Sequence, residues 1–320
     1  MKKLFAIITT LAVVSVSSCS DPKDVGPATP YENGYKTKNV VLLVVDGPRI
    51  SETWEDSTKQ HIPNRVRLLK DGVFISNFMN NGTTNTNPGH SALCSGVYED
   101  IANDGTELPG YPSVMQQWLK YTGADKTKAW IVASKDKLEV LNNCKLADWN
   151  GKYQPSADCG TDGNGSDYRS DVITMNQVKN VMKRYSPNIL VINLKDVDDR
   201  GHNKDSIGYI NAIKATDKSI TELWDYIQAL GEYKDKTTLI VSNDHGRHTA
   251  GTRRNAYTSH GDACKGCRHI EFFALGPDFK KNTIINTNNY EQIDVASTIA
   301  ELLQFPLQYA KGKVIKDAFN

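Results

Sequence analysis

Acidic and histidine side chains follow three apolar segments of the chain, at the point where each segment ends. The first segment ends at Asp46, the second runs into Asp198 and His202, and the third ends in Asp244-His245. Each pattern alone is also compatible with an ordinary turn or a solvated, charged loop. Together they combine carboxylate and imidazole groups, which are ligands that zinc and related divalent cations bind. The sequence therefore indicates a metal site assembled from separate parts of the chain.

The elements that must position these side chains alternate between strands and helices. Residues 40–45 form a near-continuous apolar run, typical of a strand buried on both faces. The alternation predicts an α/β protein, a three-layer α/β/α sandwich with a central, mostly parallel sheet. Because ligands bind outside the carboxyl ends of such strands, we expect the Asp and His side chains to meet at one edge. The expected strands are 40–45, 73–78, 129–133, 189–194, 238–241 and 270–275, the expected helices are 62–69, 113–121, 171–185, 209–230 and 292–303, and residues 148–167 are expected to form a surface loop.

The overall composition excludes several classes of protein. The 320 residues include 38 Lys+Arg and 37 Asp+Glu, and 39% of them are hydrophobic. A formal net charge of +1 and a mean hydropathy of −0.49 do not favour a nucleic-acid-binding protein, a polybasic membrane-surface protein or a multi-span membrane protein. The function must therefore come from a localised site.

The N-terminus has the features of an export signal. Lys2 and Lys3 precede an apolar stretch that is too short for a membrane-spanning helix. The stretch ends before Cys19 in a sequence that resembles the lipobox of bacterial lipoproteins, although a signal peptide with an incidental cysteine is the alternative. We predict a signal peptide over 1–18, a tether over 19–37 and one catalytic domain over 38–320. The protein would then be exported and anchored through a lipid on Cys19 to a membrane facing the periplasm or the cell surface.

Export changes the interpretation of the cysteines. In an oxidising compartment, cysteine pairs are expected to form disulfides, although their connectivity cannot be deduced from sequence. Cys264 and Cys267 could close a small loop, and Cys144 with Cys159 is a plausible second pair. Cys264, Cys267 and His269 could instead form a zinc site, for which no fourth ligand is evident.

The order of the motifs resembles the alkaline phosphatase superfamily, and especially its threonine-nucleophile members. The matching segments are VVDG, TNPGH, DxxGH, DHG and a final His before an FxxGP strand. The resemblance implies the alkaline phosphatase fold and two divalent cations, both zinc in the family pattern. His260 is preferred to His269 because the family's last ligand precedes that strand by several residues. Carried over residue by residue, the resemblance assigns one cation to Asp46, Thr86, Asp244 and His245, and the other to Asp198, His202 and His260.

The same resemblance identifies a nucleophile. Thr86 precedes Asn-Pro-Gly-His90 as the nucleophilic Thr precedes x-Pro-x-His in the related phosphodiesterases. A Thr hydroxyl is a poor nucleophile unless metal coordination stabilises its alkoxide. A simple N-cap role is the alternative for Thr86, and Thr83 and Thr84 are competing hydroxyls. Sulfatases of this fold carry Cys or Ser at the first position and Arg in place of His90, so sulfatase chemistry is disfavoured.

Four further residues bear on the substrate. Asn103 corresponds to an Asn that donates to a phosphoryl oxygen in the relatives, although it is also compatible with a turn. Lys135 and Lys137 lie in a segment similar to the SxKxR of bacterial threonine-nucleophile alkaline phosphatases, with Lys137 in place of the Arg. A charged turn is the alternative. Arg247 is a candidate for binding the part of an anionic substrate that lies beyond its phosphoryl group. The alternative is that Arg247 is solvated.

The lysine segment favours one reaction type. A phosphate monoester carries two charges on nonbridging oxygens, so an additional cation stabilises it more than a diester. With the two metals and the nucleophile that the resemblance implies, this favours a two-metal phosphohydrolase that acts on small phosphate monoesters through a phosphothreonine. The alternative is a nucleotide pyrophosphatase or phosphodiesterase. A phosphonate hydrolase, a phosphate mutase and a non-catalytic binding lipoprotein are also compatible with the fold.

Overall fold

The structure of the protein, a computed structural model, describes residues 34–251, 256–287 and 289–320. The predicted signal peptide, Cys19 and most of the predicted tether lie outside the described residues. Within these ranges, no helix combines the length and the apolar character needed to cross a membrane.

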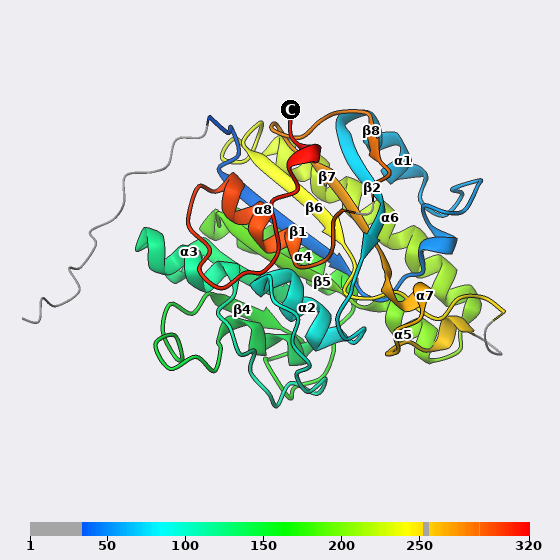
Figure 1. The fold of residues 1–320 in the computed structure, drawn as a ribbon, viewed down its shortest axis with the longest axis horizontal. Helices are drawn as coiled ribbons and strands as arrows, with labels where there is room; N and C mark the ends of the chain where they lie inside the picture. The colour runs from blue at the N-terminus through cyan, green and yellow to red at the C-terminus, as the bar shows by residue number, and fades with distance from the viewer. Residues whose placement is uncertain (1–33, 252–255, 288) are drawn as a thin grey trace, which may run out of the picture.

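One mixed sheet of eight strands forms the centre of the fold, in the order β4-β3-β5-β1-β6-β7-β2-β8 (Figure 1). The central strand, β1, runs parallel to β5 on one side and to β6 on the other. β7 is antiparallel to both of its neighbours, β6 and β2. All other neighbouring strands pair in parallel, which confirms the predicted mostly parallel sheet. The strands are β1 (Asn39–Val45), β2 (Gly72–Met79), β3 (Ala129–Ala133), β4 (Ser156–Cys159), β5 (Ile189–Leu194), β6 (Thr237–Ser242), β7 (His269–Leu275) and β8 (Thr283–Ile285).

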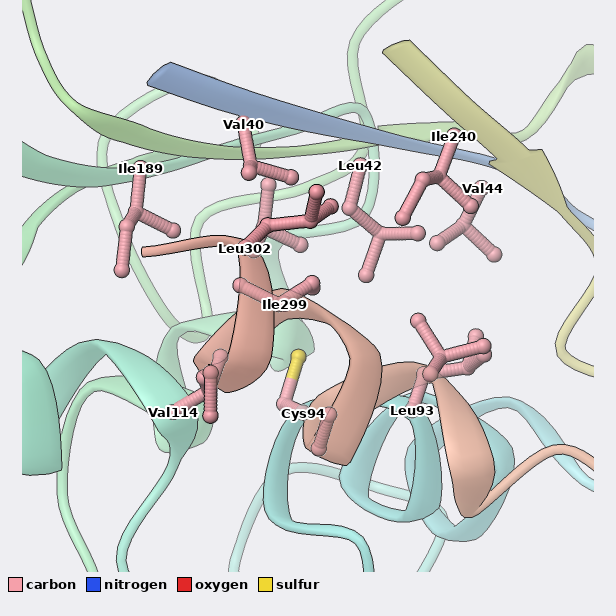
Figure 2. Packing of buried hydrophobic residues seen from close by; sticks show 14 of the residues in the cluster. Val40, Leu42, Val44, Leu93, Cys94, Val114, Ile189, Ile240, Ile299 and Leu302 are labelled. Carbon is pink, nitrogen blue, oxygen red and sulfur yellow. The ribbon is translucent and has the colours of Figure 1, made fainter. Parts of the chain in front are cut away.

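Helices cover both faces of the sheet, which confirms the three-layer architecture. Val40, Leu42 and Val44 of β1 pack into one hydrophobic cluster with α2, α3 and α8, whereas the alternate residues pack into a second cluster with α1, α4 and α6. Figure 2 shows the first cluster, with Leu93 of α2 and Ile299 of α8 facing β1. Each fully buried aliphatic side chain stabilises the fold by about 1.5–3 kcal/mol. The helices are α1 (Pro63–Leu68), α2 (Thr86–Ser95), α3 (Val114–Thr122), α4 (Asp171–Tyr185), α5 (Asp196–His202), α6 (Ser206–Ala229), α7 (Lys265–Arg268) and α8 (Asp294–Leu302).

Local sequence explains where several helices begin and end. The Ser113 side chain accepts from the backbone N–H of Gln116 and begins α3, which ends where Gly123 adopts a left-handed φ of 67°. Ser170 accepts from the backbone N–H of Ile173 in the same way and begins α4. These caps lie within one residue of the predicted helix starts.

Several elements differ from the sequence prediction. The stretch predicted as a surface loop contains β4, which pairs in parallel with β3. β4 and β8 were not predicted because they are short strands at the two edges of the sheet, with side chains that are largely not buried. The charged segment after β5 forms α5, whose three Asp residues lie in the first turn, where acidic groups stabilise a helix.

The predicted disulfides are wrong. All five described cysteines are free thiols, and Cys144 and Cys159 are both buried. Cys159 packs in the first hydrophobic cluster, and burial raises the pKa of the Cys144 and Cys159 thiols. Both side chains therefore behave as small apolar core residues.

Candidate metal centre

The three strand ends meet at the carboxyl edge of the sheet. Asp46 follows β1, Asp198 lies in α5 directly after β5, and Asp244 follows β6. Since β1 lies between β5 and β6, the three carboxylates converge. His245 Nε2 lies 3.3 Å from Asp244 Oδ2 and 3.6 Å from Asp46 Oδ1. The topology thus places the residues of the VVDG, DxxGH and DHG motifs around one small, buried volume.

The first ligand set consists of Asp46, Asp244 and His245, whose ligand atoms lie within 4.8 Å of one another. Asp46 Oδ1, Asp244 Oδ2 and His245 Nε2 are buried and have no hydrogen-bond partner within the protein. Leaving such atoms unpaired is unfavourable, and here all three face the same space. Carboxylate oxygens and an imidazole nitrogen are the donors that a divalent cation of the zinc type binds, so these residues fit one.

The second ligand set consists of Asp198, His202 and His260. His202 follows Asp198 by four residues, so α5 places both side chains on one face, with His202 Nε2 3.3 Å from Asp198 Oδ1. His260 Nε2 lies 3.0 Å from His202 Nε2 and 3.6 Å from Asp198 Oδ1. The other ring nitrogen of His260 is 2.9 Å from the Thr84 carbonyl oxygen, a contact that orients the ring as in many metal-binding histidines. His245 also lies within reach of Asp198 and His260, so it borders both sets.

The protonation states in this volume suit cation binding. Burial, followed by the neighbouring His245, lowers the pKa of His260 to about 2, which leaves the imidazole neutral. Burial opposes ionisation of Asp244 and Asp198, yet nearby cationic and imidazole groups hold the pKa of both carboxyls below its ordinary value. Burial and the neighbouring Asp244 raise the pKa of Asp46. Three carboxyl groups this close together therefore require compensating positive charge.

Thr86 and Lys135 lie against the two sets. Thr86 is the first residue of α2, and Lys135 follows β3. The buried Lys135 Nζ is 3.1 Å from Thr86 Oγ1, 2.7 Å from Asp198 Oδ2 and 2.9 Å from Asp46 Oδ2. Burial opposes its charge, but the summed attraction of the aspartates raises the pKa of Lys135 above its ordinary value. One ammonium group thus contacts the hydroxyl and a carboxylate from each ligand set.

The competing hydroxyls are engaged elsewhere. Thr83 Oγ1 donates to Asp100 Oδ1 at 3.0 Å, and Thr84 Oγ1 donates to the backbone carbonyl of Asp262 at 2.9 Å. Of the three threonines, Thr86 is therefore the one that lies beside Lys135.

Asn103 and Lys137 lie at the same end of α2. Asn103 Oδ1 accepts from the backbone N–H of Asn87 at 2.9 Å, and the Asn103 carbonyl accepts from Lys137 Nζ at 2.7 Å. Burial, followed by the nearby Lys135, lowers the pKa of Lys137 to about 8. Asn103 is thus fixed against the first turn of α2, and its carbonyl holds the Lys137 ammonium group there.

Comparison with known families agrees with this metal-binding geometry. The model of a family described as "Metalloenzyme superfamily" matches residues 38–307, a range that contains both ligand sets, Thr86 and Lys135. The chain belongs to the Metalloenzyme superfamily. Membership implies bound divalent metal ions, for which the two ligand sets provide donors.

Solved structures show that this superfamily member has the alkaline phosphatase fold. A protein of the alkaline phosphatase superfamily from Vibrio parahaemolyticus matches with a TM-score of 0.65 at 15% identity, over 89% of this chain and 71% of that chain. Murine ectonucleotide pyrophosphatase/phosphodiesterase 5 has the same TM-score and identity, over 88% of this chain and 100% of that chain. A phosphonate monoester hydrolase from Silicibacter pomeroyi matches with a TM-score of 0.62 at 12% identity, over 88% of this chain and 76% of that chain.

Two curated relatives are much longer than this Metalloenzyme superfamily chain. GPI ethanolamine phosphate transferase 1 from Emericella nidulans is 26% identical over 265 residues, which cover 70% of this chain and 26% of that protein. Its counterpart from Saccharomyces cerevisiae is 23% identical over 327 residues, which cover 86% of this chain and 34% of that protein. The chain thus spans about a third or less of these relatives.

Arg247 is not solvated, which was the alternative that the sequence left open for it. Its side chain is fully buried, and its guanidinium donates to the backbone carbonyls of Gly47 and Asp198 at 3.0 and 2.8 Å and forms an ion pair with the Asp198 carboxylate. In this superfamily member, Arg247 therefore holds the Asp198 carboxylate through Nη2, whereas its Nη1 is buried with no hydrogen-bond partner among the described residues.

Three further residues of this superfamily member position the ligand sets, and of these the sequence interpretation missed Asn193. Asn193 Nδ2 lies 3.1 Å from both Asp46 Oδ2 and His90 Nε2, and its only signal in the sequence is a polar residue inside the apolar run of β5. His90 Nδ1 in turn lies 3.5 Å from Asp244 Oδ2. Gly47 has a φ of +65°, and a Cβ there would lie 2.9 Å from Asp198 Oδ1, so the Gly of the VVDG motif keeps this space open.

Proposed function

We propose that this protein hydrolyses phosphate monoesters through a phosphothreonine formed on Thr86. The observation that carries the proposal is the position of Lys135 Nζ, which contacts Thr86 Oγ1 together with Asp46 and Asp198, one carboxylate from each ligand set. Two bound divalent cations would supply Lewis-acid stabilisation of the attacking and departing oxygens and would activate water. Asp46, Asp244 and His245 would hold one of them, and Asp198, His202 and His260 the other.

The chain's own residues define a two-step transfer. Thr86 Oγ gives up its proton to solvent and attacks phosphorus, the Oγ–P bond forms, and the bond from phosphorus to the ester oxygen breaks; that oxygen takes up a proton and leaves as the alcohol. Water then loses a proton and attacks phosphorus on the side opposite Thr86 Oγ, the Oγ–P bond breaks, Oγ regains a proton, and inorganic phosphate leaves. Two in-line displacements give net retention at phosphorus. Lys135 stabilises negative charge on Thr86 Oγ and on a nonbridging oxygen, and the Asn103 amide donates to a second nonbridging oxygen.

The two lysines support monoesters as the substrate class. Lys135 Nζ and Lys137 Nζ lie at the same end of α2 as Thr86. A monoester dianion presents two charges to these groups, whereas a diester presents one charge and a bulky second substituent. The substrate of the proposed reaction is therefore a small phosphorylated alcohol.

A second candidate function is attack by Thr86 on a phosphodiester or pyrophosphate bond. The specific observation in its favour is that both curated relatives are named GPI ethanolamine phosphate transferases and that a murine pyrophosphatase/phosphodiesterase shares the fold. The intermediate on Thr86 would then be an esterified phosphate, and either water or an acceptor alcohol would release it.

The two candidates are separated by comparing p-nitrophenyl phosphate with bis-p-nitrophenyl phosphate as substrates of the metal-loaded protein. We expect kcat/KM for the monoester to exceed that for the diester by at least about tenfold, which corresponds to about 1.4 kcal/mol of transition-state stabilisation. A chelator should abolish both activities, and added zinc should restore them. A higher kcat/KM for the diester would favour the second candidate. Hydrolysis of neither ester would overturn both.

Lys137→Arg is expected to extend the activity to higher pH. With its pKa lowered to about 8, the Lys137 ammonium is charged below that pH and becomes neutral above it. Because this charge attracts the dianionic ester, kcat/KM of the parent protein should fall as pH rises through about 8. A guanidinium stays charged throughout this range, so the fall should move to higher pH in the variant. A kcat/KM profile for p-nitrophenyl phosphate checks this, with Lys137→Met as the uncharged control; identical alkaline limbs in all three proteins would contradict it.

A further inference from the structure

A second group of metal-ligating side chains lies outside the candidate metal centre. It forms where the segment after the DHG motif meets the Cys264–Cys267 segment. His248 Nδ1 lies 3.3 Å from Cys264 Sγ, 3.5 Å from Cys267 Sγ and 3.4 Å from Asp262 Oδ1. The four ligand atoms all lie within 4.8 Å of one another.

These distances match the edges of a zinc coordination tetrahedron. With Zn–N near 2.0–2.1 Å, Zn–S near 2.3 Å and Zn–O near 2.0–2.2 Å, tetrahedral angles separate N from S by about 3.5 Å and N from O by about 3.3–3.5 Å. We propose that His248, Asp262, Cys264 and Cys267 form a structural zinc site, separate from the candidate metal centre.

The chemistry of the donors selects zinc among the common cations. Two thiolates and an imidazole are soft or intermediate ligands, whereas magnesium and calcium prefer oxygen ligands. Four protein ligands leave no open position, as in structural zinc sites. Both cysteines bind as thiolates, so each releases its proton when zinc binds.

The backbone of the Cys264–Cys267 segment packs directly against the backbone of residues 246–248. The Gly246 N–H donates to the Cys267 carbonyl at 2.8 Å, and a Cβ at Gly266 would lie only 2.4 Å from the Arg247 carbonyl oxygen. Glycine between the two cysteines therefore allows their segment to lie directly against the backbone next to His248. His248 and Cys267 are both buried, whereas Cys264 is partly buried and Asp262 lies at the surface.

This assignment replaces the histidine that the sequence suggested for a zinc site. His269 Nε2 lies 2.7 Å from the Ser76 carbonyl oxygen, and His269 Nδ1 lies 3.4 Å from Glu55. Both ring nitrogens therefore contact groups other than the two cysteines. His248 takes its place, and Asp262 supplies the fourth ligand that the sequence did not reveal.

The zinc would tie together the two ends of the loop that carries His260. His248 precedes that loop, Cys264 and Cys267 follow it, and Asp262 lies two residues after His260. Thr84 connects the two sites, because its hydroxyl donates to the Asp262 carbonyl and its own carbonyl lies 2.9 Å from His260 Nδ1. A closed loop of this kind would fix the position of the His260 imidazole relative to Asp198.

Cobalt substitution tests the site independently of catalysis. Co²⁺ bound by thiolates gives a sulfur-to-metal charge-transfer absorption, which oxygen and nitrogen ligands of the candidate metal centre do not give. We expect the reduced, cobalt-loaded protein to show this absorption and the Cys264→Ser/Cys267→Ser variant to lose it. The variant should also bind one zinc fewer per chain. Cys94→Ser, which changes a buried cysteine in α2, is the matched control and should keep both properties.

A second variant separates loss of a ligand from loss of the fold. The Asp262 side chain is 43% exposed, so Asp262→Ala leaves the packing of the core unchanged. It should keep the charge-transfer absorption and weaken zinc affinity about tenfold or more. Absence of the absorption in the reduced parent protein, equal zinc content in the parent and the double-serine variant, or unchanged zinc affinity in Asp262→Ala would each overturn the proposal. Isolation of the protein with a Cys264–Cys267 disulfide that persists in the presence of zinc would overturn it as well.

Discussion

Thr86→Ala is expected to lower kcat by on the order of 10⁴-fold or more and to abolish the phosphorylated intermediate. The substitution removes the attacking oxygen but none of the six Asp and His side chains of the two ligand sets, so the metal content should change little. Thr86→Ser restores a hydroxyl at the same place, 3.1 Å from Lys135 Nζ in the parent protein, and should recover part of the activity. Acid-quenched turnover followed by peptide mass spectrometry measures both the intermediate and its position.

Thr83→Ala is the matched control for this experiment. The Thr83 hydroxyl contacts Asp100 and none of the ligand sets, so its removal should leave the phosphorylated peptide in place. Detection of the intermediate in Thr86→Ala, on Thr83, Thr84 or any other residue, would show that the nucleophile lies elsewhere.

Much of the fold was predictable because its central strands are buried on both faces. β1 and β5 contain almost only apolar residues and β6 has an apolar centre, and such runs stand out from the helical patterns between them. β4 and β8 could not be found in this way. Both lie at the edges of the sheet: the β4 side chains Ser156, Ala157 and Asp158 are only partly buried, and β8 has only three residues, too few for an apolar pattern to stand out.

The convergence of the candidate ligands was predictable for a related reason. Parallel neighbouring strands end at the same edge, so residues after β1, β5 and β6 had to meet. The roles of supporting residues were not predictable, because they depend on distant contacts. Arg247 follows β6 in a charged segment that could have been solvated, yet it is fully buried and forms an ion pair with Asp198. The choice between His248 and His269 as a partner for the cysteines likewise depends on how two distant segments pack.

Lys135→Ala is expected to impair monoester hydrolysis far more than diester hydrolysis. Loss of one preorganised donor to a developing charge lowers the rate by about 10²–10³-fold, so kcat/KM for p-nitrophenyl phosphate should fall by that factor. Bis-p-nitrophenyl phosphate carries only one nonbridging charge, and its kcat/KM should fall about tenfold or less. The ratio of the two losses measures the preference of Lys135 for a dianion, independently of the absolute activity.

Lys135 also contacts Asp46 and Asp198, so its removal changes the charge around both ligand sets. A loss of metal would lower both activities equally, whereas a loss of dianion stabilisation lowers mainly one. Measuring zinc content and both substrates in Lys135→Ala and in Lys135→Arg separates these effects, because arginine keeps the positive charge. Equal losses for monoester and diester in a variant that retains its metals would remove the physical reason for preferring monoesters. The same protein would then be better described as a phosphodiesterase, with Lys135 serving to balance the charge of Asp46 and Asp198.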